Sequence, residues 1–134
     1  YLKETNNPET ITIDCQVCEY DAINGLTRLT FEEESLYVEQ KGLHENQKIK
    51  AKIKIKDIVI SKVLAEKSSV LNQFPAIVHS INDPESSPFA IVELKKKTQS
   101  LSARVPRKYL HILSLKEKET VFIQINNLTA CSKR

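Results

Sequence analysis

The chain is poor in glycine, aromatic residues and cysteine, and it contains neither methionine nor tryptophan. Its two glycines, Gly25 and Gly42, are too few for a glycine-rich phosphate loop, which excludes a P-loop or a dinucleotide fold within these residues. Three cysteines are an odd number, so a closed disulfide framework is not expected, and with no secretory signal this favours a reducing compartment. No apolar run approaches the roughly 20 residues of a membrane helix. The absence of methionine even at position 1 suggests a fragment of a longer protein.

Charge and length set further limits. The chain has 134 residues, enough for one domain or two very small ones, and 40% of them are hydrophobic, which allows a modest core. A net charge of +3 is too mild to indicate nucleic-acid binding by itself.

The dominant hydrophobic period is two. In Lys48–Lys56, apolar residues alternate with five lysines, which predicts a half-buried antiparallel strand, and Asp57–Ile60 continues as a strand after a kink. Asn24-Gly25 is a turn signal, and the run Glu32–Glu34 suits a solvated hairpin tip. The remaining strands are predicted at Thr10–Tyr20, Leu26–Phe31, Ser35–Glu39, Ala76–Asn82, Phe89–Leu94, Ser100–Val105 and Thr120–Ile125, with a short tail to Cys131.

One short helix is predicted after the strand that ends at Val105. Pro106 suits its first position, where a missing N–H costs nothing, and Tyr109, Leu110 and Leu113 would then face the core. About ten short strands and one helical turn indicate an all-β protein made of small barrels.

The two halves of the chain resemble each other. Ile53–Ile58 lies over Ile123–Leu128 about 70 residues later, whereas Leu36 matches Leu101 at a smaller offset. The second half therefore carries extra residues near the predicted helix. This repeat predicts two similar barrels in tandem, a first subdomain at residues 1–65 and a second at residues 66–134.

No motif in the chain indicates catalysis or metal binding. Cys15 and Cys18 have CxxC spacing, but residues i and i+3 of a strand face opposite sides, so buried small hydrophobes are the better interpretation. The three histidines are scattered, and no spacing supports a catalytic triad or a carboxylate pair. The lysines of 48–56 could meet an acidic partner or nucleic acid; without aromatic residues for base stacking, a solvated face is favoured.

Five segments, in order, carry a resemblance to a known family. Ser68–Val78 resembles the opening of the molybdate-binding MOP or TOBE domain, Leu101–Val105 its middle strand and Val121–Ile125 its last strand. Upstream, Tyr20–Leu29 and Lys52–Ser61 resemble segments of the ATP-binding subunit of molybdate importers, ModC. The ordered set covers most of the chain.

The resemblance implies two OB-like, MOP-type barrels in tandem with one short helix. It also implies the C-terminal regulatory and dimerisation region of an importer ATPase, which takes molybdate or tungstate at a barrel interface and has no cofactor of its own. The ATPase domain is absent here, so this fragment is not expected to be an enzyme. The expected partners are a second copy, the chain's own ATPase domain and the membrane permease, with no nucleic acid, in the cytoplasm at the inner face of the cell membrane.

The resemblance also implies a set of oxyanion-binding residues. They are Ser68, Ser69, Val70, Leu71, Arg104, Arg107, Asn126 and Asn127. The chain departs from the family pattern: Leu71 stands where many members have Arg, Pro106 and Tyr109 where regulators have Thr and Ser, and Asn126 where they have Lys. With fewer donors and less positive charge, the site compensates less of the free energy that a dianion loses on leaving water. Weak or altered molybdate binding is therefore expected.

Two other functions stay open at this point. One is a cytosolic oxyanion-storage or transcription-regulator effector domain of the same fold. The other is a barrel that binds single-stranded nucleic acid, against which the thin spread of aromatic residues, 6% of the chain, argues.

Overall fold

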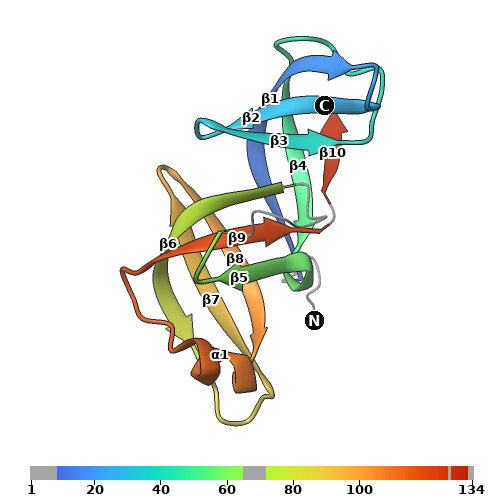
Figure 1. Ribbon diagram of the computed structural model, residues 1–134. Helices are drawn as coiled ribbons and strands as arrows, with labels where there is room; N and C mark the ends of the chain where they lie inside the picture. Colours follow the sequence, from blue (N-terminus) through green and yellow to red (C-terminus); the bar gives the residue numbers. More distant parts are fainter. Residues whose placement is uncertain (1–8, 65–71, 127, 133–134) are drawn as a thin grey trace.

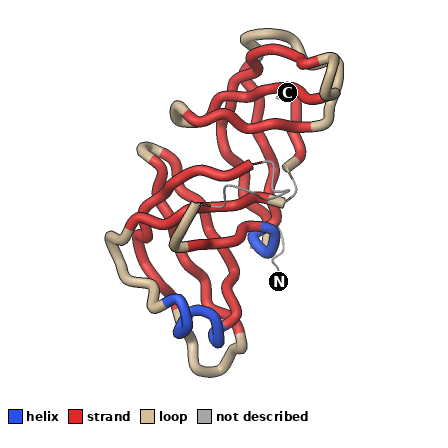
Figure 2. The backbone as a smooth tube through the Cα atoms, viewed as in Figure 1, coloured by secondary structure: helices blue, strands red, loops and turns tan. Residues whose placement is uncertain are grey.

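The computed structural model describes residues 9–64, 72–126 and 128–132. Within these residues the chain forms ten strands, one α-helix and one 3-10 helix, the all-β class that the alternating pattern predicts. The strands make two five-stranded antiparallel sheets, one above the other in Figure 1. Both helical segments belong to the lower half or to the joint between the sheets (Figure 2).

The first sheet, called here the first unit, has its longest strand at the centre. In spatial order it contains β10 (Thr129–Ser132), β4 (Lys48–Lys54), β1 (Thr10–Asp21), β2 (Leu26–Phe31) and β3 (Glu34–Val38). The predicted turn at Asn24-Gly25 joins β1 to β2, where Gly25 has a φ of 71° and its N–H donates to the Asp21 carbonyl. The predicted tip between β2 and β3 turns on Glu32 and Glu33, both with positive φ.

The second sheet, the second unit, repeats this plan. In spatial order it contains β5 (Ile58–Ser61), β9 (Thr120–Ile125), β6 (Asn72–Asn82), β7 (Phe89–Lys96) and β8 (Gln99–Pro106). The helix α1 (Arg107–Leu113) follows β8 and supplies the extra residues that the shorter offset indicated. A register shift interrupts the long central strand of both units, after Val17 in β1 and after Val78 in β6.

The two units exchange their shortest strands. β5 precedes residue 65 but pairs with β9 in the second sheet, and β10 comes last in the chain but pairs with β4 in the first. Each sheet therefore contains one strand from the other half of the sequence, so the sheets do not coincide with the expected subdomains at residues 1–65 and 66–134. The reason is the sharp 3-10 turn η1 (Ile55–Asp57), which redirects the chain after β4, at the kink that the sequence predicted.

The buried residues form one cluster that runs through both sheets. Its members alternate along the strands, as in β4, where Ile49, Ala51 and Ile53 are buried and the lysines between them are not. At the joint, Phe31 of β2 and Phe74 of β6 meet edge to face, with ring centroids 5.3 Å apart. The units therefore share a core, and burial of these side chains stabilises both together.

The short helix is present, but the prediction that Tyr109 faces the core is wrong. Leu110 is buried and Leu113 packs against the core, whereas Tyr109 is 51% exposed. The helix has only seven residues, so its apolar stripe is narrow and Tyr109 falls outside it. Pro106 is the residue before the first turn rather than its first member, and the helix ends at Ser114 in the left-handed conformation.

Three side-chain amides complete the backbone pairing where strands end. Gln40 accepts from the N–H of Ala130 (2.7 Å) and donates to its carbonyl (3.1 Å), which ties β10 to the chain just after β3. Asn72 does the same for Tyr37 of β3, at 2.7 and 3.0 Å. Gln99 makes the same pair of bonds with the backbone of Asp14 in β1, at 2.7 and 3.1 Å. The Gln40 amide connects the two ends of the first sheet, and the amides of Asn72 and Gln99 connect the two units.

A second set of contacts between the units is ionic. The tip of the β2–β3 hairpin lies against the tip of the β7–β8 hairpin, where Glu34 pairs with Lys96 (2.7 Å) and Glu33 with Lys97 (2.6 Å). Thr98 adds a hydroxyl that donates to Glu32 (2.7 Å). Two hairpins that are far apart in the sequence are therefore held tip to tip.

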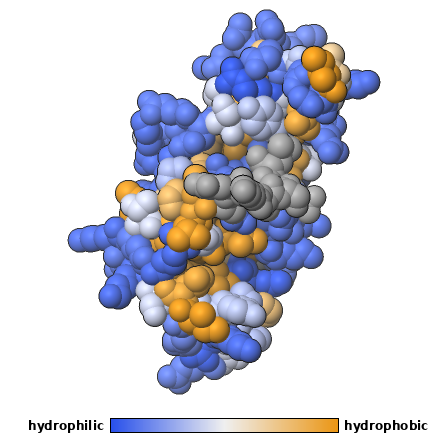
Figure 3. Space-filling view, viewed as in Figure 1, coloured by the Kyte–Doolittle hydropathy of each residue, from blue (hydrophilic) through white to orange (hydrophobic). Residues whose placement is uncertain are grey.

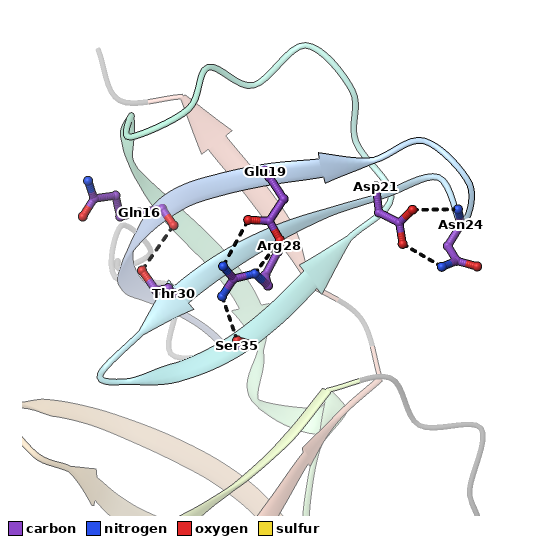
Figure 4. Close-up of polar contacts among 7 residues, drawn as sticks. All are labelled: Gln16, Glu19, Asp21, Asn24, Arg28, Thr30 and Ser35. Atoms are coloured by element: carbon purple, nitrogen blue, oxygen red, sulfur yellow. Dashed lines mark hydrogen bonds and ion pairs between the residues drawn. The ribbon is translucent and has the colours of Figure 1, made fainter.

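The outer face of the first unit is polar and internally paired. Arg28 on β2 makes two bonds to the carboxylate of Glu19 on β1, at 2.7 and 3.0 Å, and one to the hydroxyl of Ser35 on β3 (Figure 4). At the hairpin end of this face, Asp21 accepts from the backbone and side chain of Asn24. Among the described residues, no helix is long and apolar enough to cross a membrane.

Candidate functional site

Asn126 lies where the chain returns from the second unit to the first. It directly follows β9, its side chain is exposed, and its backbone N–H donates to the carbonyl of Asp57 in η1 (3.2 Å). Because η1 is the outward crossing and Asn126 is the first residue after β9, this bond places the start of the return crossing beside η1. Asn126 therefore presents its amide at the joint.

Arg104 lies on β8 with its guanidinium stacked on the ring of Phe89, 4.4 Å from the ring centroid. It is half-buried and points outward, since its neighbours Ala103 and Val105 are in the core. The stacking holds a positive charge in place without neutralising it. Arg104 therefore remains able to attract an anion.

Arg107, at the start of α1, already has an anionic partner. Its Nε lies 2.6 Å from the Asp83 carboxylate, and its backbone N–H donates to the carbonyl of Pro88 (2.8 Å). A second cation, the imidazole of His111 if protonated, lies 3.9 Å from the other oxygen of Asp83. Arg107 is thus tied to the loop between β6 and β7 and has little charge to offer a ligand.

The rest of the predicted set lies outside the described residues. This applies to Ser68, Ser69, Val70, Leu71 and Asn127. The described residue that follows the first four, Asn72, begins β6 at the joint, where its side chain bonds to Tyr37 of the other unit. Of the three described members, Arg104 and Arg107 lie at the α1 end of β8 and Asn126 lies at the joint, and no hydrogen bond or ion pair connects them within the described residues.

A groove is lined by Pro106 and Tyr109 together with Arg104. The resemblance implied that Pro106 and Tyr109 replace two hydrogen-bond donors of the family. Proline has no N–H, and Tyr109 presents an aromatic body where a small hydroxyl was expected. The groove also includes Lys56 of η1, which the sequence did not mark as a site residue. The alternation placed Lys56 on the solvated face of a strand, and only the 3-10 turn after Lys54 brings it to β8.

The cysteines do not form a site. Burial, with a smaller contribution from the charge of Asp14, raises the pKa of Cys15 to about 12, so its thiol is protonated at neutral pH. All three cysteines are free, and the described residues contain no cluster of His, Cys, Asp and Glu that could hold a metal ion.

The sequence relatives described here are all ATP-binding proteins of molybdenum import. No protein-family model matches the chain. The molybdenum import ATP-binding protein ModC of Methylococcus capsulatus is 26% identical over 116 residues, which are 87% of this chain and 33% of that protein. ModC of Saccharophagus degradans is 31% identical over 83 residues, 62% of this chain and 23% of that protein. ModC 1 of Azotobacter vinelandii is 24% identical over 86% of this chain and 32% of its own length.

This chain is similar to the C-terminal part of ModC. It spans about a third or less of the ModC proteins it matches. Among solved structures, it resembles the cytoplasmic molybdate-binding protein ModG in a molybdate-bound form, with a TM-score of 0.78 and 14% identity over 92% of this chain and 96% of that one. The likeness to ModG confirms the fold, two MOP-type units in tandem.

Proposed function

We propose that this chain is the regulatory and dimerisation region of a molybdate importer's ATP-binding subunit, and that it binds molybdate or tungstate weakly at an interface between barrels. The main support is that one chain combines a sequence match to ModC over 87% of its length with the fold of ModG. ModC is an ATP-binding protein of molybdenum import, and the ModG structure was obtained with molybdate bound.

The joint between the units offers donors suited to such an oxyanion. A tetrahedral dianion needs converging N–H and O–H groups and a fixed positive charge. Asn126 stands exposed at the joint, and Asn72 begins β6 there; Asn127 and Ser68–Leu71, the expected residues that the structure does not describe, are next to these two in the sequence. Asn126 is a neutral donor, and Arg107 is already paired with Asp83, which supports weak rather than tight binding.

Regulation then follows from population shift. If two copies pair through their barrels and the oxyanion is held only in the paired arrangement, the ligand favours that arrangement over others. In this proposal ATP hydrolysis belongs to a separate domain of the full-length protein. That protein works with a membrane permease at the cytoplasmic face of the membrane, and this region itself has no catalytic role.

The direct test is a calorimetric titration with molybdate, tungstate and sulfate, paired with sedimentation velocity. We expect molybdate and tungstate to bind with a Kd on the order of 10⁻⁴ M, sulfate to bind more weakly because it is smaller, and the dimer fraction to rise with molybdate. Equal affinity for all three oxyanions, or binding that leaves the oligomeric state unchanged, would contradict the proposal.

One observation favours a second function, oxyanion storage in the cytosol or an effector domain of a regulator. The likeness to ModG covers 96% of the ModG chain, so a stand-alone protein of this fold is a precedent. The coding sequence before Tyr1 separates the two. An ATP-binding domain upstream supports the importer subunit, whereas a DNA-binding domain or no further domain supports the alternative.

A further inference from the structure

An apolar groove opens on the second unit and extends from η1 to α1. It runs between β5 and β8, the two ends of the second sheet, and α1 closes one end of it. Its volume is about 370 Å³, within the range of small-molecule sites. The side chains that give it an apolar lining are Ile58, Val59, Ile60, Val105, Tyr109 and Leu113.

Part of this lining is exposed to solvent. Val59 is 40% exposed and Tyr109 is 51% exposed, so apolar area remains in contact with water at the groove. Val63 and Leu64, which follow β5, are also exposed, and Figure 3 shows hydrophobic side chains gathered over this part of the second unit. Covering such surface with an apolar body is favourable.

Two cations border the apolar surface. Lys56 lies at the groove from η1, and Arg104 reaches it from β8 with its guanidinium held against Phe89. Among the described residues, neither Lys56 nor Arg104 forms an ion pair with a carboxylate, in contrast to Arg107 and its partner Asp83. The nearest acidic residue in sequence, Asp57, lines a separate polar depression with Lys52 and Lys54.

We propose that this groove binds a small organic anion with an apolar body, of the class of aromatic carboxylates. The apolar lining would cover the ring, and the carboxylate would meet Arg104, whose planar fork suits two oxygens. An inorganic dianion fits the groove less well, because its donors are limited to Lys56, Arg104 and the Tyr109 hydroxyl, while Pro106 has no N–H and the aliphatic side chains offer none. The inference goes beyond the proposed function and does not depend on it: Arg104 belongs to the expected oxyanion set as well, but the rest of the groove lining and the class of ligand differ.

The test is a titration followed by backbone ¹H–¹⁵N NMR with three separate probes: 2-naphthoate, the neutral 2-naphthamide, and molybdate. We expect 2-naphthoate to give saturable shifts at Ile58–Ile60, Arg104–Val105 and Leu113, with an affinity about tenfold higher than that of 2-naphthamide. Molybdate is expected to leave these resonances unchanged, whether or not it binds at the joint.

The variant Arg104→Gln isolates the charge. It should weaken 2-naphthoate about tenfold, to the affinity of 2-naphthamide, while 2-naphthamide binds as before, which also shows that the variant is folded. Lys108→Gln removes the same charge from an exposed residue of α1 outside the groove and should change neither affinity.

Three results would overturn the inference. They are equal affinity for the acid and the amide, no saturable shift at the groove, and groove shifts that appear on raising the protein concentration alone. The last would mean that a second copy covers this face. Molybdate shifts at the joint without 2-naphthoate shifts at the groove would refute this inference while sparing the proposed function.

Discussion

Asn72 shows how much one side chain contributes beyond what its position in the sequence suggests. It is 4% exposed, and its amide makes both backbone bonds of Tyr37 on the outer edge of β3. It lies in the segment that resembles the opening of the MOP domain, but nothing in the sequence identifies a partner 35 residues away. A side-chain amide matches the hydrogen-bonding pattern of a peptide unit, and that match is visible only once the two units are docked.

Replacing this amide should destabilise the protein. Asn72→Leu leaves the N–H and C=O of Tyr37 without their partner next to an apolar side chain, and we expect a loss of about 2–3 kcal/mol in the free energy of unfolding. Urea denaturation measures it. The matched control Asn82→Leu changes an exposed asparagine and should cost under about 0.5 kcal/mol. Equal costs for the two variants would show that the amide pairing contributes nothing.

Cys15 gives a second expectation at this scale, in chemical reactivity. With a pKa of about 12 and a buried side chain, Cys15 should resist alkylation by iodoacetamide at pH 8. Cys18 and Cys131 are partly exposed and should react first. Mass spectrometry of the modified protein reads this out, with a urea-unfolded sample as control, in which all three cysteines react. Prompt labelling of Cys15 in the folded protein would contradict its placement.

The raised pKa also sets a pH dependence. The unfolded thiol ionises near 9.0 while the folded one stays protonated to about 12, so the contribution of Cys15 to stability is complete below pH 9 and falls as the pH rises toward 12. Cys15→Val should therefore reduce the loss of stability between pH 9 and 11 in urea denaturation. An unchanged alkaline slope would speak against a buried thiol.

At the scale of elements, alternation was enough to locate the strands. The predicted bounds of β2 and β9 agree with the structure, because both strands have one buried and one solvated face. Alternation could not assign pairing for β5 and β10, since a four-residue strand fits either sheet and tertiary contacts decide. The sequence could not predict the groove between β5 and β8 either, because that groove depends on the pairing of β5 with the second sheet.

The two hairpin tips make a testable contact between elements. Lys96 and Glu34 are partly sheltered, with 13% and 27% of their side chains exposed, so their attraction is screened less than that of a surface pair. A double-mutant cycle with Lys96→Ala and Glu34→Ala should give a coupling of about 1 kcal/mol. The reversed pair Lys96→Glu with Glu34→Lys should recover part of it. A coupling free energy near zero would show that the Lys96–Glu34 pair does not stabilise the contact between the hairpin tips.

The neighbouring exposed pair adds a pH dependence of known sign. The bond from Lys97 lowers the pKa of Glu33 below its ordinary value of 4.5. Its contribution is therefore present above pH 4.5 and disappears as the pH falls through the lower folded pKa. The Glu33→Gln variant should accordingly lose less stability on acidification than the wild type. Salt should weaken this contact more than that of Lys96.

At the scale of the whole molecule, the internal repeat was visible in the sequence but the exchange of strands was not. Leu36 and Leu101, matched by the shorter offset, occupy equivalent buried positions in β3 and β8. Of the predicted site, the sequence supplied the departures at Pro106, Tyr109 and Asn126. It could not show that Asp83 forms an ion pair with Arg107, because that contact depends on the conformation of the loop between β6 and β7.

The exchange makes the two halves depend on each other. A fragment of residues 1–65 carries β5 without its partner β9 and lacks β10, which covers the edge of β4. We expect the fragments 1–65 and 66–134 to be unfolded separately and to assemble when mixed, as judged by the dispersion of ¹H–¹⁵N NMR spectra. A well-dispersed spectrum from residues 1–65 alone would contradict shared stability, and so would two separate transitions in the urea unfolding of the intact chain.

The most direct test of the account is molybdate binding by the wild type and by Asn126→Lys, compared by calorimetry. The side chain of Asn126 is exposed at the joint, so a lysine there adds positive charge beside the proposed oxyanion site with little disturbance of packing. We predict weak binding by the wild type and an affinity about tenfold higher for Asn126→Lys, while Asn82→Lys, which adds the same charge elsewhere, changes little. Tight binding by the wild type would contradict a weakened site, and no gain from Asn126→Lys over Asn82→Lys would contradict an oxyanion site at the joint.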